Sequence, residues 1–231
     1  MFQIPIGWLQ LKREKLRFAV ALLGVAFAVI LILMQLGFRE ALFNSAVRVH
    51  DALDGDLVIL SREQSYIVEP RSFSQRRLYQ ARGVAGVASV TPVYLGVGMW
   101  KNPETHGNRA LFAIGIDPAE RVLRLPQVVA QQNAIVREDD VLFDELSRPE
   151  YGPVAERLRA GAPFAAELNH RELRVAGLYQ LGTSFGIDGS IVTSDTNFLR
   201  LFPDRERGLI ELGLVRLAPG ASAERVRDAI R

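Results

Sequence analysis

The chain has 231 residues, 48% of them hydrophobic and 23% charged, with a formal net charge of +2 and no cysteine, which excludes disulfides and thiolate chemistry. Residues 1–17 carry four basic side chains and one acidic side chain, so the other 214 residues have a net charge of −1. Because this basic excess lies outside the main body of the chain, we expect no nucleic-acid partner.

The first segment, 1–17, predicts a short helix that lies on the cytoplasmic surface of a membrane. Pro5 suits the first turn of such a helix. Trp8, Leu9 and Leu11 stand beside basic residues at 12, 13 and 15, an arrangement typical of interfacial helices. These three apolar residues are our candidates for contact with a cytoplasmic partner.

Residues 18–38, FAVALLGVAFAVILILMQLGF, predict a transmembrane helix. Gln35 is the single strongly polar side chain among them. At about 1.5 Å per residue the segment extends roughly 31 Å, which matches a hydrocarbon core of about 30 Å. Basic residues dominate the N-terminal flank, whereas Arg39 and Glu40 on the other flank cancel. The positive-inside rule therefore predicts a cytoplasmic N-terminus and an external domain.

Other interpretations of this apolar segment are a cleaved signal peptide and a buried helix of a soluble protein. The run is longer than a signal peptide requires and no small-x-small cleavage site follows it. Ala21, Gly24 and Ala28 fall on one helical face and could let a second transmembrane helix approach closely. Small residues are also common in any such span, so both explanations stand.

The helical pattern continues beyond the span as a stalk, 39–55, which Gly55 would end. Leu42, Ala46, Val49 and Leu53 recur at spacings of four, three and four, which makes an apolar seam. The seam could pack on a second stalk helix or on the chain's own domain. In the first case, these side chains would be less buried here than apolar residues usually are.

From residue 56 to 231 the sequence predicts an α+β domain, because short strands and short helices mix without strict alternation. The segments 87–100 and 109–116 form a predicted hairpin, in which Pro92 requires an edge or bulge position. Strands are expected at 57–60, 87–100, 109–116, 164–168, 172–181, 189–194 and 209–217. Helices are expected at 72–83, 117–120, 154–160, 196–202 and from Ser222 onward.

Motifs for catalysis or metal binding are weak. Gly182–Gly186 matches G-x-S-x-G, but a strand rather than a helix is expected after it, so a nucleophile elbow at Ser184 is disfavoured. The acidic residues at 138, 139, 140, 144 and 145 lack the ligand spacing of a calcium loop and are interpreted as a solvated face. The three histidines are too scattered for zinc, and no P-loop motif occurs. We therefore expect no cofactor and a mechanical, structural or binding role.

Several segments resemble the DevC branch of the FtsX/MacB-type permeases of ABC exporters. The resembling segments are 8–43, 87–103 (VASVTPVYLGVGMWKNP), 114–118 (IGIDP) and 182–203 (GTSFGIDGSIVTSDTNFLRLFP). The resemblance implies a MacB-like external domain and three further transmembrane helices, so this sequence, whose last helix has no C-cap, is expected to be an N-terminal fragment. It also explains Gly182–Gly186 as a family loop.

The resemblance further implies a homodimeric permease in the bacterial inner membrane, with its main domain in the periplasm. ATP would be hydrolysed by a separate ABC ATPase subunit, so the chain itself would not be an enzyme. The external domain would dock a periplasmic membrane-fusion adaptor and, through it, a TolC-like outer-membrane channel, for export of glycolipid. Two other functions stay open: a membrane-anchored sensor or receptor and, less favoured, an anchored hydrolase.

The charge asymmetry makes a topological prediction. A reporter fused after Arg231 should be active outside the cytoplasm, and protease added from that side should digest residues 56–231. A domain that stays protected would reverse the orientation and contradict the exporter interpretation.

Overall fold

The structure is a computed structural model that describes residues 15–64, 69–184 and 186–231, without the side chains of 40–47. It has two compact units, Met1–Ala46 and Val47–Arg231. Helix α2 (Lys15–Asp51) supplies the described part of the first unit, and its last residues, from Val47, belong to the second. We refer to the second unit as the domain. The predicted transmembrane helix and stalk are thus one helix, which ends four residues before Gly55.

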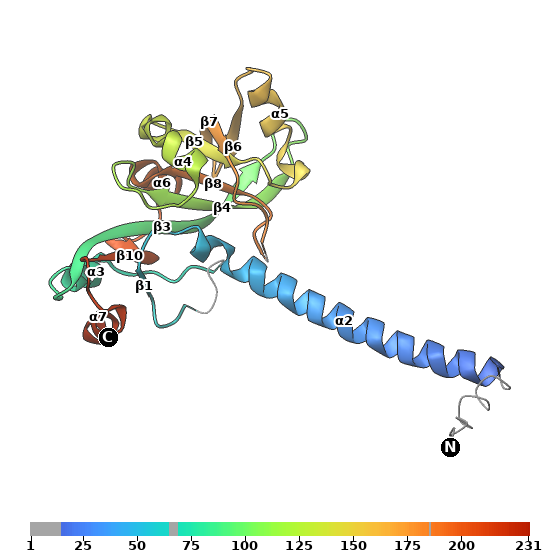
Figure 1. Ribbon diagram of the computed structural model, residues 1–231. Helices are drawn as coiled ribbons and strands as arrows, with labels where there is room; N and C mark the ends of the chain where they lie inside the picture. Colours follow the sequence, from blue (N-terminus) through green and yellow to red (C-terminus); the bar gives the residue numbers. More distant parts are fainter. Residues whose placement is uncertain (1–14, 65–68, 185) are drawn as a thin grey trace. The chain divides into compact units, whose positions relative to one another are not determined.

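The domain is a mixed sheet with helices on its faces (Figure 1), which confirms the expected α+β fold. Its strands are β1 (Leu57–Leu60), β2 (Phe73–Ser74), β3 (Val87–Lys101), β4 (Asn108–Ile116), β5 (Asp140–Asp144), β6 (Ala165–Leu168), β7 (Arg171–Tyr179), β8 (Ser190–Ser194), β9 (Leu209–Ile210) and β10 (Leu212–Leu217). Its helices are α3 (Gln75–Ala81), α4 (Pro126–Ala130), α5 (Val154–Arg159), α6 (Asp195–Leu201) and α7 (Ala223–Ile230), with 3-10 helices η1 (Gln132–Val136) and η2 (Pro149–Tyr151).

The long strand β3 runs through the whole domain and links its two parts (Figure 1). Its first half pairs with β10, and β10 pairs in turn with β1. Its second half forms the predicted antiparallel hairpin with β4, from Tyr94↔Gly115 to Lys101↔Asn108. Beyond β4 the order is β8-β5-β7-β6, and β6 pairs back with β3 at Trp100↔Leu168. Six strands therefore pair in a closed ring that begins and ends at β3.

The central strands are buried on both faces, because two hydrophobic clusters divide their side chains. On β4, Leu111 and Ala113 enter one cluster, whereas Phe112 and Ile114 enter the other. This alternation is the period of two that a strand requires. Trp100 is fully buried and donates its indole N–H to the carbonyl of Tyr151 at 3.1 Å, so its one polar group is satisfied within the core.

Some predicted boundaries are wrong for local reasons. The expected helix at 117–120 is a turn in which the Asp117 carboxylate accepts from the Ala119 N–H, so the side chain closes an Asx turn. Ser74 rather than Ser72 caps α3. The strand expected at 209–217 divides at Glu211: β9 before it pairs with β2, and β10 after it pairs with β3. The Glu211 carboxylate accepts from the Leu95 N–H at 2.9 Å and so replaces the missing strand contact.

Candidate coupling site at the end of the apolar helix

Within the described residues, one helical segment, Lys15–Arg39, is long and apolar enough to cross a membrane. None of its most apolar stretch is buried, and Ala21, Gly24 and Ala28 are all exposed. A methyl group at Gly24 would meet no atom within 4 Å. This face is free to accept another helix, and its packing role stays a prediction.

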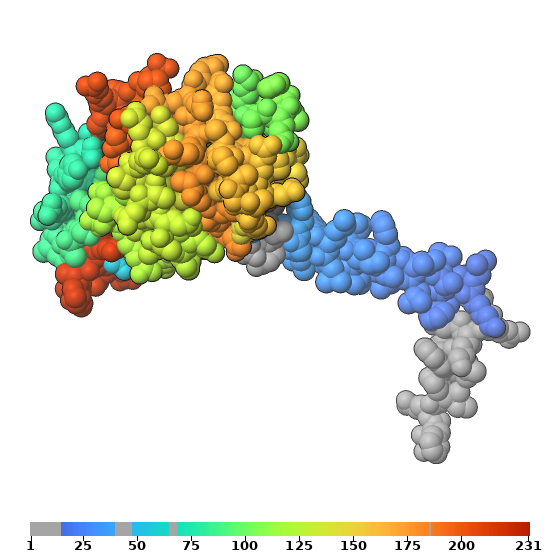
Figure 2. Space-filling view, turned by 90° about the horizontal axis from the view of Figure 1, so that it is seen from above, coloured from blue at the N-terminus to red at the C-terminus, as the bar shows by residue number. Residues whose placement is uncertain are grey.

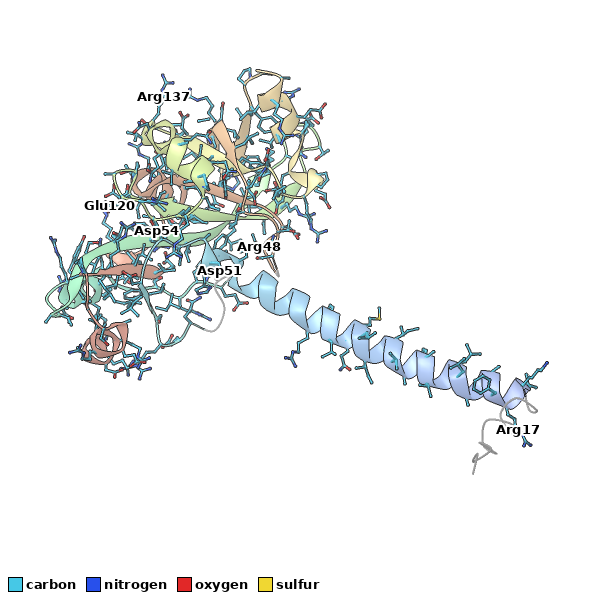
Figure 3. The ribbon with its side chains drawn as sticks, in the orientation of Figure 1. Arg17, Arg48, Asp51, Asp54, Glu120 and Arg137 are labelled. Carbon is cyan, nitrogen blue, oxygen red and sulfur yellow. The ribbon has the colours of Figure 1, made fainter. Side chains whose placement is uncertain are left out.

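The candidate site is the helix-end junction, which we define as residues 47–56 with residues 121–124 and Arg216. Figure 3 labels Arg48, Asp51 and Asp54 at this point. Trp8, Leu9 and Leu11 lie outside the described residues, as do the side chains of Leu42 and Ala46. The structure therefore says nothing about these five predicted interaction residues.

Main-chain hydrogen bonds tie the junction to the domain. Leu53 and Leu123 form an antiparallel bridge. The Asp54 N–H donates to the carbonyl of Val122 at 2.8 Å, and the Arg124 N–H donates to the carbonyl of Ala52 at 2.7 Å. Two residues later, the Asp56 N–H donates to Val215 of β10 at 3.0 Å. The chain that leaves α2 is thus paired first with the segment before α4 and then with the sheet.

Apolar packing reinforces this pairing and decides, for two residues of the seam, which surface they pack on. Val49 is 2% exposed and Leu53 is 4% exposed, and both belong to the core cluster that contains Val122 and Leu123. At these two positions the seam packs on the chain's own domain, the alternative that the sequence left open. Burial of each such side chain stabilises the fold by about 1.5–3 kcal/mol. Of the two alternatives, packing on the chain's own domain therefore holds for Val49 and Leu53.

Ion pairs of Asp54 are the third kind of contact at the junction. Its carboxylate lies 3.1 Å from Arg121 Nε, 3.2 Å from Arg124 Nε and 3.2 Å from Arg216 Nη2. Each exposed pair contributes at most about 1 kcal/mol, but one carboxylate shared by three guanidinium groups fixes the geometry of the chain at the end of α2. No local pattern reveals this cluster, because Arg124 and Arg216 are 70 and 162 residues away from Asp54.

The Gly182–Gly186 loop lies beside the junction and is held by a buried carboxylate. Asp144 is fully buried, and its side chain accepts from the Leu181 N–H at 3.1 Å and the Gly182 N–H at 2.8 Å. Burial raises the pKa of Asp144, while these N–H donors oppose the rise. A side chain at Gly182 would come within 2.5 Å of Arg48 Nη1, so the loop approaches the last turn of α2 closely.

Ser184 has no nucleophile-elbow geometry. It exchanges main-chain hydrogen bonds with Ile187 at 2.9 and 3.0 Å, and strand β8 follows instead of a helix. In the described ranges, no three His, Asp or Glu side chains gather as metal ligands would.

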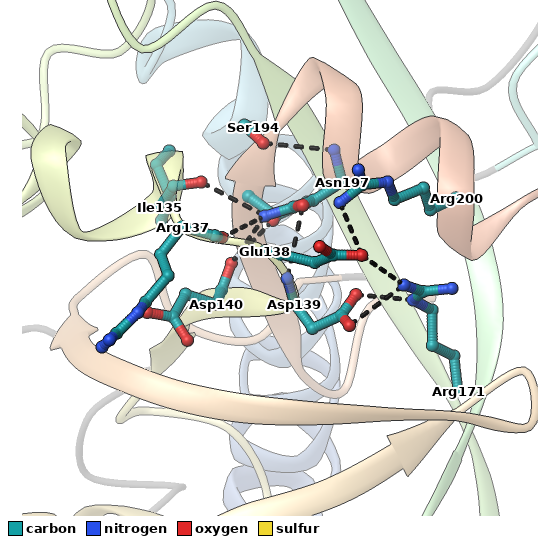
Figure 4. A network of polar contacts seen from close by, with 10 residues as sticks. Ile135, Arg137, Glu138, Asp139, Asp140, Arg171, Ser194, Asn197 and Arg200 are labelled. Carbon is teal, nitrogen blue, oxygen red and sulfur yellow. Dashed lines mark hydrogen bonds and ion pairs between the residues drawn. The ribbon is translucent and has the colours of Figure 1, made fainter.

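The acidic run at 138–145 is not the solvated face that its composition suggested. Asp140 is 4% exposed and Asp144 is fully buried, because the intervening apolar residues form the buried strand β5. Asp139 pairs with Arg171 through Nε at 2.5 Å and Nη2 at 3.0 Å, and its N–H donates to the amide oxygen of Asn197 (Figure 4). The Asn197 amide N–H₂ donates to the carbonyl of Arg137 at 2.8 Å. Glu138 remains exposed and pairs with Arg171 and Arg200 in this network, whereas Glu145 pairs with Arg159 outside it.

Comparison with known proteins decides the family. The family model described as "MacB-like periplasmic core domain" matches residues 18–231. The chain belongs to this family. The match begins inside the apolar helix and includes the whole domain, so helix and domain are parts of one family unit. Comparison with the curated proteins finds no match.

Solved structures give distant matches. One is the periplasmic region of MacB from Actinobacillus actinomycetemcomitans, with 12% identity, a TM-score of 0.48, and coverage of 79% of this chain and 83% of that one. Another is the extracellular domain of the noncanonic ABC-type transporter YknZ from Gram-positive bacteria, with 13% identity, a TM-score of 0.45, and coverage of 74% and 85%. A domain of a putative permease protein from Porphyromonas gingivalis has 16% identity, a TM-score of 0.41 and 65% coverage of both chains.

The junction predicts a stability effect at Val49. Val49→Asp places a charge in the core, so the domain should lose several kcal/mol of stability and its melting temperature should fall by on the order of 10 °C. Fluorescence of the buried Trp100 in the detergent-solubilised chain measures this transition.

Val136→Asp is the matched control, because Val136 is 62% exposed and the substitution is the same. We expect this control to melt within error of the parent chain. Equal melting of the Val49→Asp chain and the parent would show that Val49 is not part of the domain core.

Proposed function

We propose that this chain acts in the permease subunit of an ATP-driven exporter, in which α2 carries movement from the membrane into the external domain. The observation that carries the proposal is that α2 combines two different environments in one helix. One continuous helix has an exposed apolar span at one end, and at the other end Val49 lies in the domain core. Membership of the MacB-like family supports the transport role.

The junction suggests how a displacement of α2 would spread. A movement of its last turn would act on Val122 and Arg124 through main-chain hydrogen bonds, and on β10 through Asp56. Hydrogen bonds and packed side chains transmit strain because a close-packed core yields little. Arg48, beside Gly182, offers a second path toward Asp144 and β5.

The partners are proposed from the resemblance and from what the sequence contains. The chain has no P-loop, so ATP would be hydrolysed by a separate ABC ATPase subunit, contacted through Trp8, Leu9 and Leu11. A second copy would pack on Ala21, Gly24 and Ala28, and the domain would dock a periplasmic adaptor that leads to a TolC-like channel. We place the chain in the inner membrane with its domain in the periplasm, and glycolipid of the DevC type is the proposed cargo.

The proposal predicts that a break in α2 uncouples the domain from the ATPase. Asn44→Pro removes a helical hydrogen bond and clashes with the preceding turn, at a cost of about 3 kcal/mol or more in a helix interior. The domain begins at Val47, so its melting temperature should not change. ATP hydrolysis by the complete transporter should persist, whereas ATP-driven movement of the domain should be lost.

Energy transfer measures that movement without knowledge of the cargo. Because the chain has no cysteine, a single Val136→Cys carries a donor dye, and the acceptor is a labelled lipid in the same nanodisc. Asn44→Ala is the control at the same position and should keep the ATP-dependent signal. An undiminished signal in Asn44→Pro would show that α2 does not carry the stroke.

A further inference from the structure

The arginines of one part of the domain have carboxylate partners, whereas several of those in another part have none among the described residues. Between residues 87 and 217 nearly every arginine pairs with a carboxylate, as Arg109 does with Asp188 at 2.5 Å and Arg205 with Glu211 at 2.6 Å. By contrast, a group near α3 and α7 forms no ion pair within the part of the chain that the structure describes. Its members are Arg71, Arg76, Arg77, Arg82 and Arg225.

These residues lie together at one end of the domain. The turn after α3 touches α7, since a side chain at Gly86 would come within 3.0 Å of Val226. The side chain of Arg62 reaches the carbonyl of Arg231 at 3.5 Å. Figures 1 and 2 show α3 and α7 on the same side of the domain. We define the arginine-rich end as Arg62, Arg71, Arg76, Arg77, Arg82, Arg225, Arg227 and Arg231, all exposed.

The charge of this end is opposite to that of the remaining chain. Residues 61–86 and 218–231 contain these eight arginines and four acids, Glu63, Glu69, Glu224 and Asp228, a net charge of +4. Since residues 18–231 carry −1 in total, the remainder of that range carries −5. Arg227 pairs with Asp228 at 3.1 Å, but the arginines outnumber the acids two to one, so the excess positive charge repels itself and an anionic partner would relieve that cost.

The side chains favour phosphate as that partner. A guanidinium group presents a planar fork of donors that binds phosphate oxygens in pairs. Tyr79 is 52% exposed on α3, three residues after Arg76 and three before Arg82. An exposed aromatic ring among arginines is typical of surfaces at the headgroup level of a membrane.

The apolar span of α2 makes a lipid headgroup the favoured source of this phosphate. A domain that follows an apolar span is tethered to a bilayer, so headgroup phosphates are present at high effective concentration whichever side the domain is on. We propose that the arginine-rich end binds the anionic phospholipid headgroups of the membrane that α2 spans. This site would hold the domain against the bilayer surface, and it is independent of ATP and cargo.

The test places the full chain in nanodiscs of phosphatidylcholine alone or mixed with phosphatidylglycerol. A single Ala223→Cys on α7 carries a dye, and a quencher is attached to the lipid headgroups. We expect strong quenching only with phosphatidylglycerol, and its loss as salt rises, because the Debye length falls from about 10 Å at 0.1 M to about 3 Å at 1 M.

The variant Arg76→Gln, Arg77→Gln, Arg225→Gln should lose this quenching. Each arginine near an anionic surface contributes about fivefold to binding, so the bound-to-free ratio should fall roughly a hundredfold. The control Arg137→Gln, Arg157→Gln, Arg200→Gln removes equal charge elsewhere on the domain and should keep the parent signal; Figure 3 labels Arg137 far from α7.

Trp100 fluorescence checks that both triple variants stay folded. Equal quenching in neutral and anionic lipid would overturn the proposal, as would equal loss in the two triple variants. Absence of quenching in both lipids would also overturn it and would assign the arginines to an acidic macromolecule instead.

Discussion

The main-chain pairing between the end of α2 and the segment before α4 is the constraint on which the rest of the structure depends. Ala52 and Asp54 exchange hydrogen bonds with Arg124 and Val122, and this places Leu53 against Leu123 inside the core. Each hydrogen bond has a net value of about 1 kcal/mol, but leaving a buried N–H unpaired would cost about 1–3 kcal/mol. The last turn of α2 and the residues after it, 47–56, are therefore a built part of the domain.

Close packing restricts which residues fit at the helix-end junction. Gly55 follows Asp54 where a Cβ would come within 2.4 Å of the buried Leu214 side chain, so a larger residue would force that side chain to move. The three arginines around Asp54 come from either side of the Leu123 bridge and from β10, and they join the same two segments that the hydrogen bonds join. Main-chain hydrogen bonds, apolar packing and ion pairs thus all hold the end of α2 in the same position against residues 121–124 and β10.

The sequence predicted those features whose determinants are local. The two strand-like segments and the polar loop between them were sufficient to predict the β3–β4 hairpin. Ser222, as an N-cap residue, was sufficient to predict where α7 begins. The apolar helix followed from its length and composition. The resemblance to MacB-type permeases led to the correct family, although nothing in the fold distinguishes the DevC branch.

Features that depend on distant partners could not be predicted. Asp140 and Asp144 lie at the two ends of the buried strand β5, and their carboxylates are paired by Arg174 and by the 181–182 N–H groups, partners from other elements that composition cannot reveal. The seam periodicity correctly identified Val49 and Leu53 as packing residues, but periodicity does not say which surface they pack on. No sequence pattern identified Asp54 as the centre of an ion-pair cluster, because its partners are the distant residues Arg121, Arg124 and Arg216.

Hydrogen exchange of individual amides in the detergent-solubilised chain tests the central claim most directly. If the end of α2 is part of the domain core, the N–H groups of Asp54 and Arg124 should exchange only on global unfolding, at the rate of the central strand β4. Exchange at these amides that is much faster than in β4, like that of a fraying helix end, would contradict the account and would show that the end of α2 is not part of the domain core.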